Sequence, residues 1–166
     1  MKKRIFKLFL IFIIIWFFYL ILFSDKTVII EDERVPLSIN PTKINKEEEI
    51  NSLLISINLM RKKYDLEELI LDEELCEFAD IRSKELADKW SHERPNGQQG
   101  YSLIDSSKWG GENLAKNYFN AKDVLDGWCN SPTHLDNLLF KEYTKCGISI
   151  YQDNYGYSYW CIMFSS

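Results

Sequence analysis

The stretch that decides the fold is "CGISIYQDNYGYSYWCIMF", residues 146–164, close to the end of the chain. Two runs rich in β-branched and aromatic residues flank the sequence Asp-Asn-Tyr-Gly, whose residues are typical of turns. This pattern predicts an antiparallel β-hairpin. If Asp153 and Asn154 alone formed the turn, Cys146 and Cys161 would lie opposite each other on adjacent strands. A longer loop would shift that register.

The region ahead of the hairpin has the period of helices. From Glu47, apolar residues recur every three or four positions to about residue 64, which predicts a first helix. A second helix is expected after an Asp72 N-cap, a third after an Asn120 N-cap, and a short fourth from Pro132. Helices followed by a terminal hairpin predict an α+β domain, in which the helices pack on an antiparallel sheet.

Residues 1–24 have a different character. An unbroken apolar run from Leu8 to Phe23 follows four basic residues and is about long enough to span a bilayer. Ser24 follows large apolar residues and fits a signal-peptidase site poorly, so the pattern favours an uncleaved transmembrane anchor over a signal peptide. The positive flank predicts a single-pass protein of the cell membrane, with everything after about Asp25 outside the cytoplasm. Cleavage would give a secreted protein instead.

The rest of the chain divides in two. Residues 25–46 contain Pro36 and Pro41 and mixed charge, and we expect a linker there. Residues 47–166 suit one compact domain. Outside residues 1–24 the chain has 16 basic and 25 acidic residues, a net charge of −9. Nucleic acid and anionic lipid headgroups are therefore poor partners for it.

All four cysteines fall on the predicted outer side of the membrane, where disulfide bonds persist. They are Cys76, Cys129, Cys146 and Cys161. Four cysteines permit three pairings, and their spacing does not choose among them. A zinc site built from them is less favoured, because the sequence has no C-x-x-C pair.

The residues that could carry chemistry are His92, Glu112 and His134. The sequence contains no H-E-x-x-H, no glycine-rich phosphate loop and no G-x-S-x-G. His92 and Glu112 lie in the irregular stretch 91–113, and His134 lies near the start of the fourth helix. Two histidines and a carboxylate would suit a zinc ion with one position left for water. Spacing alone, however, favours ordinary hydrogen-bonded histidines.

Four motifs in order resemble those of a known family. They are "SHERPNG" at 91–97, "GGENLA" at 110–115, "WCNSPTHLDNLL" at 128–139 and "YWCIMF" at 159–164. In this order they resemble bacterial SCP-like domains of the CAP superfamily, which comprises cysteine-rich secretory proteins, antigen 5 and pathogenesis-related proteins. The resemblance covers residues 47–166. It implies an α-β-α sandwich with a three-stranded antiparallel sheet between helical layers, preceded here by the N-terminal transmembrane helix.

The resemblance also implies a central cleft in which two histidines and two acids face each other. In some relatives this cleft holds a divalent metal such as zinc. His92, Glu112 and His134 match three of the four positions and are candidate metal ligands. The second acid falls on Ser131, which removes a negative charge from the cleft and should weaken cation binding. We expect the Ser131 hydroxyl to cap the fourth helix instead, by accepting a hydrogen bond from the amide of His134. Ile162, where many bacterial members have glutamine, predicts a more apolar cleft floor.

Three functions stay open at this point, and no residue is assigned a catalytic role. The first is a membrane-anchored, extracytoplasmic binding domain whose cleft recognises a cell-envelope component, a small hydrophobic molecule or a protein partner. The second is a zinc-dependent, peptidase-like hydrolase that uses His92, Glu112 and His134. It lacks an evident general base, because Glu112 cannot easily serve as both ligand and base. The third is a structural protein of the envelope or of a spore layer.

Overall fold

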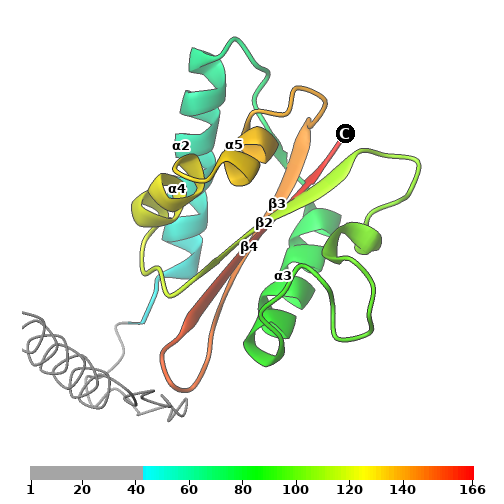
Figure 1. Cartoon of the computed structure of the whole chain (residues 1–166). Helices are drawn as coiled ribbons and strands as arrows, with labels where there is room; N and C mark the ends of the chain where they lie inside the picture. Colours follow the sequence, from blue (N-terminus) through cyan, green and yellow to red (C-terminus); the bar gives the residue numbers. More distant parts are fainter. Residues whose placement is uncertain (1–42) are drawn as a thin grey trace, which may run out of the picture. The chain divides into compact units, whose positions relative to one another are not determined.

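The computed structural model describes residues 43–166, so the predicted anchor and most of the predicted linker lie outside the described residues. Within residues 43–166 no helix is both long and apolar enough to cross a membrane. The helices are α2 (Lys46–Lys63), α3 (Glu73–Asp88), α4 (Ala121–Cys129), α5 (Pro132–Leu138) and the 3-10 helix η1 (Gly100–Leu103) (Figure 1). The strands are β1 (Ile70–Leu71), β2 (Gly110–Lys116), β3 (Lys145–Gln152) and β4 (Ser158–Ser165).

The sheet has the strand order β1-β3-β4-β2. Strands β3, β4 and β2 form the antiparallel part that the sequence predicted. The prediction of three strands was incomplete, because β1 joins β3 in parallel. The Ile70 and Asp72 amides donate to the carbonyls of Thr144 and Cys146, each at 2.9 Å. The sheet is therefore four-stranded and mixed, and β2 lies at its other edge.

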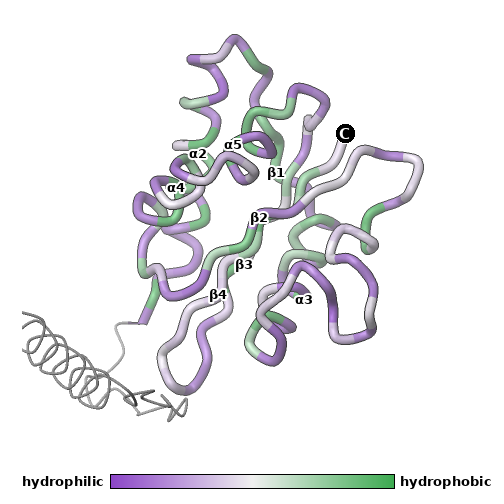
Figure 2. Tube along the Cα trace, viewed as in Figure 1, coloured by the Kyte–Doolittle hydropathy of each residue, from purple (hydrophilic) through white to green (hydrophobic). Residues whose placement is uncertain are grey.

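Helices cover both faces of this sheet, as the predicted sandwich requires (Figure 1). Side chains of β4 alternate between the two faces. Trp160, Ile162 and Phe164 belong to the larger core, together with residues of α2 and α4. Cys161 and Met163 pack on the opposite face with α3. Figure 2 shows hydrophobic stretches both on the strands and on the helices beside them, whereas the connecting loops are mostly hydrophilic.

The predicted helix starts are confirmed by their caps. The Asp72 side chain accepts from the amide of Leu75 at the start of α3, and Asn120 accepts from Asp123 at the start of α4. Helix α3 lies very close to β3, because a Cβ atom on Gly147 would come within 2.0 Å of the backbone of Leu75. Only glycine allows this approach.

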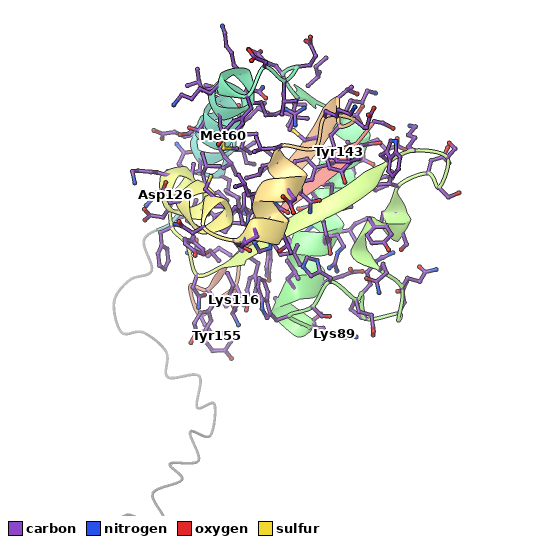
Figure 3. The ribbon with its side chains drawn as sticks, turned by 45° about the horizontal axis from the view of Figure 1, so that its top comes forward. Met60, Lys89, Lys116, Asp126, Tyr143 and Tyr155 are labelled. Atoms are coloured by element: carbon purple, nitrogen blue, oxygen red, sulfur yellow. The ribbon has the colours of Figure 1, made fainter. Side chains whose placement is uncertain are left out.

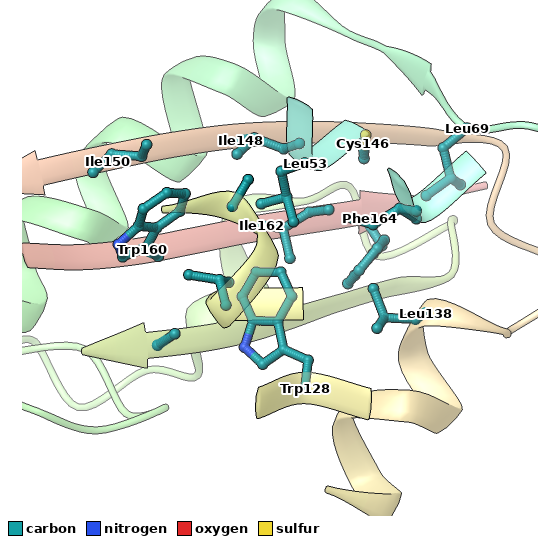
Figure 4. Packing of buried hydrophobic residues seen from close by; sticks show 14 of the residues in the cluster. Leu53, Leu69, Trp128, Leu138, Cys146, Ile148, Ile150, Trp160, Ile162 and Phe164 are labelled. Carbon is teal, nitrogen blue, oxygen red and sulfur yellow. The ribbon is translucent and has the colours of Figure 1, made fainter. Parts of the chain in front are cut away.

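Trp128 and Leu138 fasten α4 and α5 to the larger core (Figure 4). Their side chains are almost fully buried, at 2% and 0% exposure. Leu114 of β2 is also buried, and it faces the α3 side of the sheet. Ile162 is fully buried in the larger core.

The hairpin loop runs over residues 153–157, since Gln152 pairs with Ser158. The Asp153 carboxylate holds this loop by accepting from the amides of Tyr155 and Tyr157, both at 2.9 Å. The loop is longer than a two-residue turn and moves the register by three positions. Cys146 now pairs with Phe164, and Cys161 pairs with Ser149.

Of the two alternatives, the longer loop is the one that forms, so Cys146 and Cys161 do not lie opposite each other. A shift by an odd number of residues moves one side chain to the opposite face of the sheet. Accordingly, Cys146 packs in the larger core and Cys161 in the smaller one. All four cysteines are free thiols in the structure. Burial raises the pKa of the Cys146 thiol to about 12.

Arg61 of α2 is fully buried and holds the segment that follows α5. Its guanidinium donates to the carbonyl oxygens of Leu138 (2.9 Å), Phe140 (3.2 Å) and Tyr143 (2.9 Å), and also to Glu67 (2.8 Å). These carbonyls have left the helix ladder, so the arginine satisfies acceptors that would otherwise be buried without partners. These bonds tie the end of α5 and the segment after it to α2.

Candidate functional site

Glu112 stands at the centre of the candidate site. It lies in the middle of β2 with its side chain toward α3, and only 2% of that side chain is exposed. Arg82 donates from Nε to Oε2 at 3.0 Å and from Nη2 to Oε1 at 3.2 Å. His92 Nδ1 lies 2.8 Å from Oε1. Both carboxylate oxygens are thus engaged by side chains of the same chain.

Arg82 is the buried counter-charge of this site. Its side chain is 0% exposed, and it donates further to Glu85 Oε2 at 2.7 Å and to the carbonyl of Ser91 at 2.9 Å. Burial by itself would lower the pKa of Arg82, but the hydrogen bonds to Glu112 and Glu85 outweigh it and the pKa is raised. Arg94 binds Glu85 at 2.8 and 3.1 Å and extends the row of alternating charges to the surface.

The loop over Glu112 runs from His92 to Gly100. A bridge between Glu93 and Gln99 closes it, and the Gly100 amide donates to the His92 carbonyl at 2.8 Å. A Cβ atom on Gly100 would lie 2.2 Å from Glu112 Oε2. Glycine at this position therefore lets the loop lie directly on the carboxylate.

Helix α5 approaches β2 from the other side (Figure 1). Asn113 faces this helix, because side chains alternate along a strand, and its Nδ2 donates to the carbonyl of His134 at 2.9 Å. Asn137 donates to Asn113 Oδ1 at 2.9 Å and to the carbonyl of Glu112 at 3.2 Å. The backbone carbonyl on the free edge of β2 is thus occupied by an amide side chain, which fixes α5 against the strand.

The two histidines differ in exposure. The His92 side chain is 57% exposed, whereas His134 is only partly exposed. Burial lowers the pKa of His134, and the nearby His92 lowers it further. The structure thus joins His92 directly to Glu112 and brings His134 within electrostatic range of His92.

Ser131 occupies the position before α5, as predicted, and Pro132 is the first residue of the helix. Its hydroxyl makes no capping hydrogen bond, so the predicted bond from the His134 amide was wrong. The Ser131 carbonyl instead accepts from the amide of Leu135 at 2.9 Å, which is the ordinary helical bond. The orientation of α5 comes from Asn113 and Asn137 rather than from Ser131.

The three-ligand metal arrangement predicted from His92, Glu112 and His134 is not supported by this geometry. Among residues 43–166, no three histidine, cysteine or acidic side chains are grouped so as to hold a metal ion. The Glu112 carboxylate already has a guanidinium as its cation, so a divalent metal at its oxygens would be repelled by Arg82. The residues present therefore do not fit zinc with Glu112 as a ligand.

The described cavities lie away from these residues. One of about 610 Å³ is lined by residues 43–47 and Gln152, and one of about 120 Å³ lies where α3 begins, near Lys108 and Lys145. Neither includes His92, Glu112 or His134. A cleft at the candidate site stays a prediction.

Sequence reasoning missed Arg82 as a member of the site. It lies on the apolar stripe of α3, between Ala79 and Leu86, where its regular spacing resembles that of a core residue. The charge of Arg82 was the signal that could have identified it. An arginine on a buried helical stripe requires an acidic partner.

Comparisons with known proteins agree with this fold. The family model described as "CAP: Cysteine-rich secretory protein family" matches residues 54–164, more than half of the 166-residue chain. The chain is 31% identical to the Bacillus subtilis (strain 168) protein YkwD over 97 residues, covering 55% of this chain and 38% of YkwD. It is 30% identical to the B. subtilis membrane protein YlbC over 100 residues, covering 56% of this chain and 29% of YlbC. The chain thus spans about a third of the length of these relatives.

Solved structures show the same fold. An outer surface protein from Borrelia burgdorferi superposes with a TM-score of 0.65 at 23% identity, over 75% of this chain and 98% of that one. An extracellular SCP-domain protein from Bacillus anthracis gives a TM-score of 0.63 at 23% identity, over 72% of this chain and 40% of that one. With the ordered motifs, the sandwich and the family match in agreement, this chain belongs to the CAP family of cysteine-rich secretory proteins.

Proposed function

We propose that this protein is a membrane-anchored, extracytoplasmic CAP domain that binds a component of the cell envelope through His92, Glu112 and His134. The observation that carries the proposal is the internal neutralisation of Glu112. Arg82 and His92 engage both carboxylate oxygens, while the His92 ring remains 57% exposed. Such an arrangement offers a fixed, polar surface for recognition.

The same contacts favour binding over hydrolysis. A metal-dependent hydrolase needs an open coordination position and a general base within reach of the attacked water. Both Glu112 oxygens already accept hydrogen bonds from Arg82 or His92, and only 2% of the side chain is exposed, which disfavours either role. Serine, cysteine or threonine next to a base would be the other route to a covalent step. The Ser91 hydroxyl accepts from the amide of Glu93, which does not orient it toward His92.

The location follows from the chain and its relatives together. A basic flank and an apolar run precede the domain, YlbC is named a membrane protein, and the B. anthracis relative is named extracellular. A domain on the extracytoplasmic face of the cell membrane lies next to the polymers of the cell envelope. Its net charge of −9 outside residues 1–24 disfavours nucleic acid and anionic lipid as ligands.

Sedimentation with purified peptidoglycan sacculi tests the proposal. The full chain in mild detergent should sediment with sacculi, and His92→Gln combined with His134→Gln should abolish this. The matched control is Asp126→Asn, an exposed position on the outer side of α4 (Figure 3). It should bind like the unaltered chain.

The outcomes separate the three functions. Sedimentation that survives both histidine substitutions would reject the site and favour a structural envelope role. Release of soluble fragments from the sacculi, abolished by the same substitutions, would favour the hydrolase. Absence of sedimentation with sacculi would reject peptidoglycan as the bound component.

A further inference from the structure

We propose that Arg82, acting through Glu112, fixes His92 in the tautomer that carries its proton on Nδ1. The site would then present Nε2 of His92 as a hydrogen-bond acceptor to ligands that donate a hydroxyl or amide proton. The ligand part rests on the binding function proposed above, whereas the tautomer is a property of the protein itself. Arg82 and Glu112 are positioning residues in this scheme.

The contact between Glu112 and His92 has one possible donor. Arg82 donates to both oxygens of Glu112 at 3.0 and 3.2 Å, which is the geometry of a carboxylate ion paired with a guanidinium. An ionised carboxylate accepts hydrogen bonds and cannot donate them. The 2.8 Å contact to Oε1 therefore requires that His92 Nδ1 carries the hydrogen.

Several contacts hold this geometry in place. Arg82 is fully buried, and its guanidinium is shared among Glu112, Glu85 and the carbonyl of Ser91, the residue before His92. The backbone of His92 is also fixed, because its carbonyl accepts from Gly100. Arg82 of α3 thus holds the backbone next to His92, and Glu112 of β2 holds the ring at Nδ1.

The exposed side of the His92 ring offers an acceptor. A neutral imidazole carries one hydrogen, so Nδ1–H leaves a lone pair on Nε2. More than half of the His92 side chain is exposed, which leaves the ring accessible to a ligand. A hydroxyl or amide N–H can donate to Nε2. A ligand that brings only acceptors, such as a carboxylate oxygen, would meet that lone pair and be disfavoured.

Nitrogen NMR of the full chain tests the tautomer directly. The chain has two histidines, so ¹⁵N-histidine labelling gives four ring nitrogens, and His134→Gln assigns them. At about pH 8, in the neutral imidazole, His92 should show a protonated Nδ1 and an unprotonated Nε2. We expect at least about a tenfold excess of this form, in keeping with a charge-assisted hydrogen bond. A protonated Nε2 in the unaltered chain overturns the proposal, and this measurement needs no variant.

Glu112→Gln tests the route through Glu112. A glutamine amide can either accept from Nδ1 or donate to it, so both tautomers should become populated. The matched control is Glu93→Gln, an exposed neighbour that pairs with Lys89. It should leave His92 unchanged. A glutamine variant with well-dispersed amide signals and an unaltered His92 tautomer would reject the role of Glu112.

Two probes test the ligand chemistry and distinguish its sources. Chitotetraose supplies hydroxyl donors, its fully O-methylated form supplies none from hydroxyls, and tetra-alanine supplies peptide amides. We expect the Nε2 signal of His92 to shift with at least one donor probe. If sugar hydroxyls donate to Nε2, the methylated sugar should give a smaller shift than chitotetraose. No shift with any probe rejects the ligand class but leaves the tautomer standing, and the sacculus assay then decides the proposed function separately.

Discussion

Arg82→Met is the substitution that most directly tests the architecture of the site. Methionine fills much of the space on α3 but removes the charge, so Glu112 stays buried with His92 as its remaining side-chain partner. Breaking a buried ion pair by removing one partner costs about 3–5 kcal/mol, because an uncompensated charge is left inside. Glu85 adds little to this figure, since it keeps Arg94. We expect a loss near the middle of that range.

A double-mutant cycle separates this effect from ordinary packing. Urea unfolding of the full chain, followed by tryptophan fluorescence, gives the free energy of unfolding for Arg82→Met, Glu112→Gln and the pair together. Residues in direct contact should couple by about 0.5–3 kcal/mol, so the double variant should lose less than the two single losses combined. A loss below about 1 kcal/mol for Arg82→Met, or simple additivity, would refute the view that Glu112 depends on this guanidinium.

Three further predictions concern the surroundings of the site. Gly100→Ala places a methyl group 2.2 Å from the Glu112 carboxylate, so unfolding measurements should show a loss of about 1–3 kcal/mol, and Ser102→Ala in the same 3-10 helix should be nearly neutral. Arg61→Met leaves several buried carbonyls without a donor and should lower the free energy of unfolding by at least about 2 kcal/mol; an unchanged value would contradict the role of Arg61 in holding α5. For His134, burial and then His92 lower the folded-state pKa below 6.5, so the unfolded chain binds the proton more readily. The free energy of unfolding should therefore fall as pH drops below about 6.5, and His134→Gln should remove that part of the pH dependence in denaturant titrations between about pH 5 and 8.

Much of the fold was predictable because it depends on local chemistry. Asp72 and Asn120 cap their helices through their own side chains, and Pro132 begins α5, so short sequence signals placed these helices. The prediction for Ser131 placed the residue correctly and its hydrogen bond wrongly. A residue can stand at the N-cap position without a capping hydrogen bond from its side chain. The sequence does not distinguish this case from a side-chain cap.

For the candidate site, the sequence motifs identified His92, Glu112 and His134, and the structure places the first two in direct contact. They did not reveal what Glu112 is bonded to. Arg82 precedes it by 30 residues and meets it only because α3 packs against the sheet. A pairing between distant residues depends on the packing of whole elements, which no local pattern contains.

The sequence by itself determined the α+β class, the helix starts, the terminal hairpin and the ordered motifs of the CAP family. The tertiary structure alone decided the register of the hairpin, and with it the separation of Cys146 and Cys161 onto opposite faces. It also decided that Glu112 is neutralised from within by Arg82. The physical reason is the same in both cases. Periodicity and capping act over a few residues, whereas register and buried charge pairing are set by contacts between segments far apart in the chain.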